Sequence, residues 1–61
     1  MYHVMDRPKD EVSNVDLCSC YRSESREDIL EWVERNGAND SQYSIYDGTK
    51  TLSVTDFCSN I

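Results

Sequence analysis

Four residues of this chain have side chains of the types that bind zinc: His3, Cys18, Cys20 and Cys58. Structural zinc sites usually present two cysteines that are separated by two to four residues on a turn. Here only Ser19 lies between Cys18 and Cys20, and the surrounding residues alternate in the manner of a β-strand. We therefore expect small thiols that are mostly buried, with no metal or other cofactor, and the zinc site remains the alternative.

Redox chemistry and catalysis have weaker support. In a strand, Cys18 and Cys20 point the same way about 7 Å apart, whereas the Cβ atoms of a disulfide lie near 3.8 Å. No Ser/His/Asp order or nucleophile elbow surrounds His3, the single histidine. The two glycines, Gly37 and Gly48, form no phosphate-binding loop. We expect a protein that is not an enzyme.

Charge supports a binding function more directly. Twelve Asp and Glu residues against six Lys and Arg give a formal net charge of −6. This excess argues against direct binding to nucleic acid or to an anionic membrane, and it favours a partner with a basic surface. Five of the acids share the outer face of one predicted helix, and they are our candidate contacts: Glu24, Glu27, Asp28, Glu31 and Glu34.

The helix that positions these acids has clear boundaries. Ser25 is a favoured N-cap, acids fill the first turn, and Asn36-Gly37 ends the helix with a glycine suited to a left-handed cap. The apolar residues fall on one arc, with Trp32 at its margin: Ile29, Leu30 and Val33. The pattern predicts an amphipathic helix of about 12 residues, or roughly 18 Å.

Strands are predicted on both sides of this helix. A first strand covers residues 2–6, and a second covers residues 15–22 after a polar loop. Asp47-Gly48 predicts a two-residue hairpin turn that sets Tyr46 opposite Thr49. Stepping outward from the turn, Ile45 opposes Lys50, Tyr43 opposes Leu52 and Ser41 opposes Val54. Phe57 is expected to close the edge of the core.

These elements predict an α+β fold in a single domain over residues 1–61. Two β-hairpins form a small antiparallel or mixed sheet, and the amphipathic helix packs on one face, which is a ββαββ arrangement. The Ser/Thr/Tyr face of the last hairpin is left uncovered. Trp32 and Tyr46 therefore join the candidate contacts, because aromatic side chains often anchor interfaces.

The chain resembles the small accessory proteins of bacteriophages in its short early strand, its Ser-Arg-Glu-Asp-Ile-Leu-Glu-Trp-Val-Glu-Arg-Asn-Gly helix and its Tyr-Ser-Ile-Tyr-Asp-Gly hairpin. Several proteins of that class are acidic inhibitors of host proteins, and some mimic DNA. The resemblance implies a partner such as a host nuclease, polymerase, CRISPR or repair protein.

Two functions follow as expectations. The first is a DNA-mimic inhibitor that acts in the host cytoplasm, since no segment has the composition of a membrane span or signal peptide. The alternative is a regulatory or structural module that forms a homodimer through the hairpin face around Tyr46 and Thr51.

Overall fold

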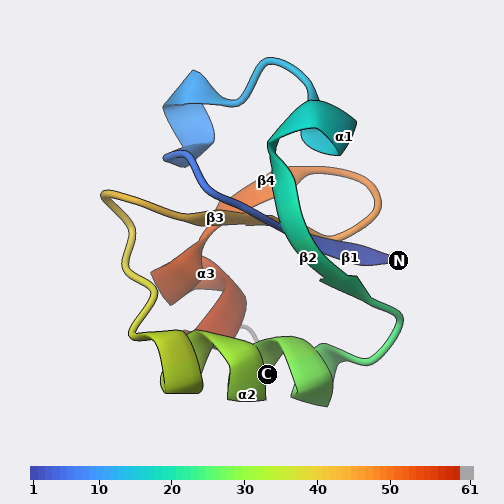
Figure 1. Ribbon diagram of the computed structural model, residues 1–61, viewed down its shortest axis with the longest axis vertical. Coiled ribbons are helices and arrows are strands. Elements are labelled where there is room, and N and C mark those ends of the chain that lie inside the picture. Colours follow the sequence, from blue (N-terminus) through green and yellow to red (C-terminus); the bar gives the residue numbers. More distant parts are fainter. Residues whose placement is uncertain (60–61) are drawn as a thin grey trace.

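Four short strands form one antiparallel sheet in the computed structural model, which describes residues 1–59 (Figure 1). The strands are β1 (Tyr2–Met5), β2 (Ser19–Ser23), β3 (Ser44–Tyr46) and β4 (Thr51–Ser53). Their order in the sheet is β2-β1-β3-β4. The β1 and β3 strands therefore lie in the interior, and β2 is an edge.

Two helices cover one face of the sheet, α2 (Arg26–Asn36) and α3 (Val54–Ser59) (Figure 1). Their apolar side chains meet those of the strands in the core, which includes Phe57 at 2% exposure as the sequence predicted. The members of this core are Val4, Ile29, Val33, Ile45, Val54 and Phe57. Alternation along the strands places Val4 and Ile45 on this face and their neighbours on the other.

Both predicted ends of α2 are confirmed. The Ser25 hydroxyl accepts a hydrogen bond of 3.3 Å from the backbone N–H of Asp28, which satisfies one of the free donors of the first turn. At the other end, Gly37 takes a φ of 61°, a conformation that costs glycine little. The backbone N–H of Ala38 then reaches back to the carbonyl of Val33 at 3.1 Å.

The opposite face of the sheet is also partly covered, contrary to the prediction from the sequence. The 3-10 helix η1 (Lys9–Glu11) and helix α1 (Val15–Cys18) lie on this side (Figure 1). Beneath them Met5 and Ser44 are fully buried, and the Ser44 hydroxyl donates a hydrogen bond of 2.8 Å to the carbonyl of Arg7. The Ser/Thr/Tyr face of the last hairpin was predicted to be uncovered. That prediction is wrong for Ser44, which is buried.

The predicted strand over residues 15–22 is half helix. The Asn14 side chain accepts a hydrogen bond from the N–H of Leu17 at 3.2 Å and caps the single turn of α1, so the strand begins only at Ser19. Leu17 is consequently 84% exposed rather than part of a sheet face. Pairing then slips by one residue, which leaves Cys20 as the extra residue of a β-bulge.

The last hairpin has a longer turn than predicted. Tyr46 pairs with Thr51 and Ile45 with Leu52, so residues 47–50 form a four-residue loop. The side chain of Asp47 accepts hydrogen bonds from the N–H groups of Thr49 and Lys50, both at 2.8 Å. Because the register differs by two residues, Ile45 and Leu52 remain on the predicted face.

The predicted fold class is thus confirmed as α+β with an antiparallel sheet. The ββαββ arrangement differs from the structure in two respects. Helix α1 intervenes between β1 and β2 and helix α3 follows β4, while the strand order brings β1 and β3 together as the junction of the two hairpins.

Candidate functional site

An acidic ridge runs along the outer face of α2. Glu27, Glu31 and Glu34 are all exposed. At 100° per residue they fall within an arc of about 60°, with steps of roughly 6 Å and 4.5 Å along the axis. Ile29 and Val33, which pack in the core, lie on the other side of the helix. The three carboxylates can therefore meet a partner without any change in the core.

Only the middle acid of the ridge forms an ion pair among residues 1–59. Glu31 contacts Arg35 at 2.8 Å one turn later, with 59% and 76% of the two side chains exposed. A surface pair of this kind contributes about 0–1 kcal/mol to stability, because water screens both charges. The side chains of Glu27 and Glu34 are exposed to solvent.

Asp28, the fourth acid of the helix, has a structural role instead. One carboxylate oxygen accepts a hydrogen bond of 2.6 Å from the Tyr21 hydroxyl, and the side chain is half-buried. This bond, with a second from Ser23, lowers the pKa of Asp28. The same bond raises the pKa of the Tyr21 hydroxyl. Asp28 thus joins α2 to the edge strand β2.

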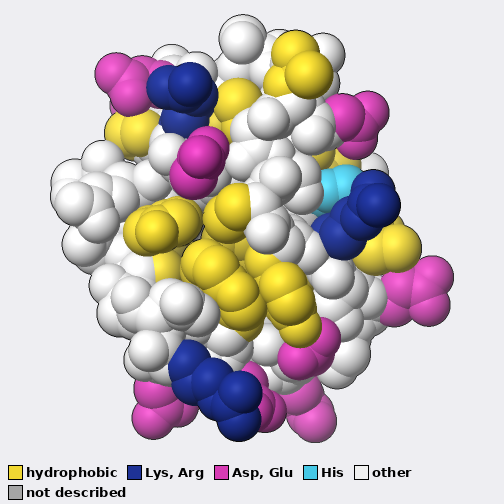
Figure 2. Space-filling model, viewed as in Figure 1, with side chains coloured by type: hydrophobic (Ala, Val, Ile, Leu, Met, Phe, Trp, Pro, Cys, Tyr) yellow, Lys and Arg dark blue, Asp and Glu magenta, His cyan; other side chains and the backbone are white. Residues whose placement is uncertain are grey.

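Trp32 lies on the flank of the helix rather than on the ridge. Its ring stacks on Tyr21, with centroids 5.6 Å apart and planes inclined by 16°, and it meets Tyr43 edge to face at 5.7 Å. Each of the three rings is half-buried. A continuous hydrophobic area occupies the corresponding part of Figure 2, between β2 and α2. We call the set of Tyr21, Trp32 and Tyr43 the aromatic patch.

The structure therefore separates the predicted contacts. Glu24 is exposed but precedes the helix, and Trp32 is about 140° from Glu27 around the helix axis. Tyr46 lies on the sheet face opposite α2, where its ring approaches His3 and its hydroxyl donates to the carbonyl of Gly48. Tyr46 and the ridge therefore lie on different sides of the sheet. Sequence reasoning missed Tyr21 and Tyr43, whose place beside Trp32 depends on strand order.

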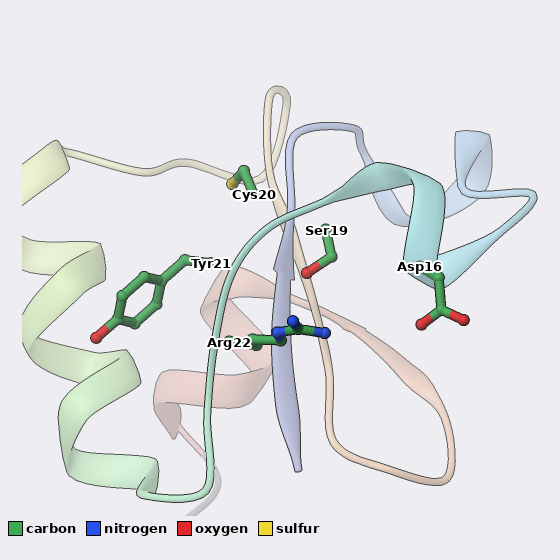
Figure 3. A pocket seen from close by; sticks show the side chains of 5 residues that line it. All are labelled: Asp16, Ser19, Cys20, Tyr21 and Arg22. Atoms are coloured by element: carbon green, nitrogen blue, oxygen red, sulfur yellow. The ribbon is translucent and has the colours of Figure 1, made fainter.

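A hollow of about 260 Å³ follows the free edge of β2 (Figure 3). Four consecutive strand residues line it together with Asp16 of α1; they are Ser19, Cys20, Tyr21 and Arg22. These consecutive residues belong to both faces of the strand. The hollow therefore lies beside the edge of β2 and not over one face of the sheet. Figure 3 shows Tyr21 directed toward α2, with Arg22 and Asp16 on the other side of the strand.

The chemistry available in this hollow is limited. Partial desolvation and the negative charge of Asp6 raise the pKa of the exposed Cys20 thiol, which slows its reactions at neutral pH. Ser19 contacts His3 Nδ1 at 3.2 Å, but no carboxylate in residues 1–59 hydrogen-bonds that imidazole. A serine and histidine without an orienting group or an oxyanion site lack most of a hydrolytic apparatus.

The four residues considered as zinc ligands do not assemble. Cys18 is buried in α1, whereas Cys20 and Cys58 are exposed on separate elements. In the described part of the chain, no three His, Cys, Asp or Glu side chains lie close enough together to hold a metal ion.

Comparisons with protein-family models, with curated proteins and with solved structures found no match to this chain. Within residues 1–59, none of the helices has the length and apolar character needed to cross a lipid bilayer.

Proposed function

We propose that this chain is a non-catalytic inhibitor of the phage type, which occupies the basic nucleic-acid-binding groove of a host protein with the acidic ridge of α2. The observation that carries the proposal is the alignment of Glu27, Glu31 and Glu34 in one exposed row. Each strand of B-DNA presents phosphates at about 3.4 Å along the axis. The spacing of the ridge is of the same order.

Electrostatics support this function in two further ways. The net charge of −6 would accelerate association with a basic groove and would make binding sensitive to salt. In addition, the ridge lies on a helix whose opposite face is anchored in the core, so little ordering would be needed on binding.

The test is capture from a bacterial lysate on the immobilised protein, followed by a DNA-competition assay on whatever is retained. Wild-type protein should retain a nucleic-acid-binding protein, release it as salt is raised, and displace DNA from it. The variant Glu27→Gln/Glu34→Gln removes two ridge charges while keeping side-chain length and helix propensity. It should release the partner at lower salt and compete poorly with DNA.

The matched control is Asp10→Asn/Glu11→Gln, which removes two exposed acids from η1 on the other side of the sheet. Both double variants have the same net charge. Equal loss of binding in the two would mean that net charge alone matters, and it would contradict a role for the ridge. A captured protein that keeps its DNA in the presence of the domain would reject the proposal outright.

Self-association is the second candidate function, and one observation favours it. Among the strands of residues 1–59, β2 pairs only with β1, and the hollow along its free edge is lined by consecutive strand residues. An edge of this kind can add a strand from a second copy, giving an antiparallel pair. Sedimentation discriminates between the candidates, since a monomer at every attainable concentration rejects self-association.

A further inference from the structure

The aromatic patch lies next to three charged groups of α2. The Tyr21 hydroxyl donates a hydrogen bond of 2.6 Å to Asp28, and Glu31 follows Asp28 by three residues on the same side of the helix, where it pairs with Arg35 at 2.8 Å. Asp28, Glu31 and Arg35 therefore all lie near the phenol end of the patch. The patch is apolar in its middle and predominantly acidic at this end.

We propose that the partner of the acidic ridge places an arginine against the aromatic patch, with its guanidinium stacked on the rings and paired with Glu31. This inference rests on the proposed function and names the side chain that the site would recognise. An arginine suits the patch better than a lysine, because its planar group stacks on aromatic rings and can bind a carboxylate through two donors. The ridge would attract the partner, and the patch would select the cation.

The molecule contains a similar contact elsewhere. The guanidinium carbon of Arg26 lies 5.1 Å from the centre of the Phe57 ring, and its Nη2 atom donates to the Phe57 carbonyl at 2.9 Å. That contact combines ring stacking with an oxygen acceptor. The aromatic patch offers the same combination at the surface, with Glu31 as the acceptor.

Arg35 holds the position that the incoming arginine would take on Glu31. The pair is 2.8 Å long, and most of both side chains is exposed, so displacement of Arg35 costs little. The chain thus contains an internal competitor for its own acidic group. Removing that competitor should strengthen binding of an external arginine.

Trp32 provides a direct measurement because it is the single tryptophan of the chain. Its fluorescence would be followed during titration with nona-arginine and, separately, with nona-lysine at fixed ionic strength. The two peptides carry the same charge, so the ridge should attract both. We expect nona-arginine to bind about two- to fivefold more tightly and to alter the Trp32 emission, as exposed cation–π contacts of this strength would give.

Paired variants locate the effect. Glu31→Gln and Glu34→Gln each remove one acid from the ridge, but only Glu31 adjoins the patch. Glu31→Gln should abolish the preference for nona-arginine, whereas Glu34→Gln should weaken both peptides and keep the preference. Arg35→Gln and Lys9→Gln each remove one positive charge, and only Arg35→Gln should increase that preference.

The outcomes separate the two proposals. Equal binding of the two peptides, or a preference that survives Glu31→Gln, overturns the arginine site and leaves the ridge intact. Failure of both peptides to bind wild-type protein overturns the ridge and the arginine site together. A preference lost only in Glu31→Gln, with altered Trp32 emission, supports both.

Discussion

The hydroxyl of Tyr21 donates a hydrogen bond of 2.6 Å to Asp28, and this bond joins the edge strand β2 to the first turn of α2. The bond holds one side of the aromatic patch in place, because the Tyr21 ring also stacks on Trp32. It also removes Asp28 from the set of acids that are free to meet a partner. Asp28 therefore positions the site, while Glu31 and its neighbours on the ridge present the charge.

Tyr21→Phe should reduce the stability of the protein in a pH-dependent way. The bond lowers the pKa of Asp28 from 3.8 and raises the pKa of Tyr21 from 10.0. Its stabilisation is therefore fully present between these two values. It is lost as the pH falls below 3.8 through the lowered pKa of Asp28, and as the pH rises above 10.0 through the raised pKa of Tyr21. Urea unfolding of both proteins across this range checks the prediction.

Tyr43→Phe is the control for this experiment. It removes a hydroxyl from the same aromatic patch without touching Asp28, so its effect on the free energy of unfolding should not follow the titration of Asp28. If the difference between wild type and Tyr21→Phe is unchanged in acid, the bond to Asp28 does not stabilise the fold.

Asp47 should make the last hairpin sensitive to acid. Its Oδ1 atom accepts three hydrogen bonds of 2.8 Å from Thr49 and Lys50, which lower its pKa from 3.8 to about 2. The stabilisation is present above 3.8 and is lost as the pH falls toward 2. Asp47→Ala should therefore melt at a lower temperature than wild type at pH 7, and the two should converge near pH 2.

The neutral variant Asp47→Asn separates charge from geometry in that turn. Its amide oxygen can still accept from the backbone, but it binds no proton in this range. It should keep more of the stability at pH 7 than Asp47→Ala does, and the acid dependence due to this residue should disappear. An undiminished acid dependence would assign the effect to other carboxylates.

Ser44→Ala tests whether the second face of the sheet is covered. The Ser44 side chain is fully buried and bonds to the carbonyl of Arg7, so its loss should cost about 0.5–1.5 kcal/mol in the free energy of unfolding. Leu17→Ser, at a position that is 84% exposed, should change stability by less than about 0.5 kcal/mol. Chemical denaturation measures both. A neutral Ser44→Ala would mean that the segment after β1 does not pack on this face.

The cysteines should differ in reactivity. Iodoacetamide should modify the exposed Cys20 and Cys58 in the native protein, whereas the buried Cys18 should react only after unfolding. Asp6→Asn should accelerate the reaction of Cys20, because it removes a negative charge that raises the pKa of that thiol. Peptide mapping by mass spectrometry identifies each site. Rapid modification of Cys18 in native protein would contradict the packing of α1.

Prediction from the sequence succeeded where a local rule determines the structure. Ser25 and Gly37 mark the ends of α2, and each acts through hydrogen bonds with backbone groups a few residues away. Prediction failed where two local signals competed. The alternation of residues 15–22 suggested a strand, but Asn14 caps a helical turn that takes Val15–Cys18 out of it. In the last hairpin, Asp47 uses its side chain to bond two N–H groups and so lengthens the loop.

The aromatic patch could not be predicted because its members come from three elements. Tyr21 belongs to β2, Trp32 to α2, and Tyr43 to the segment before β3. Their contact depends on the strand order and on the side of the sheet that α2 covers, neither of which is encoded near any of the three. The acidic ridge, by contrast, follows from helical spacing alone.

The central place of β1 has a consequence for synthesis on the ribosome. This strand leaves the exit tunnel before the other strands of the sheet, yet its partner β3 follows roughly forty residues later in the chain. Until then β1 can pair only with β2, and the edge that will receive β3 stays open. Since a two-stranded hairpin is marginal in water, the domain should acquire stable structure only after β3 and β4 have emerged.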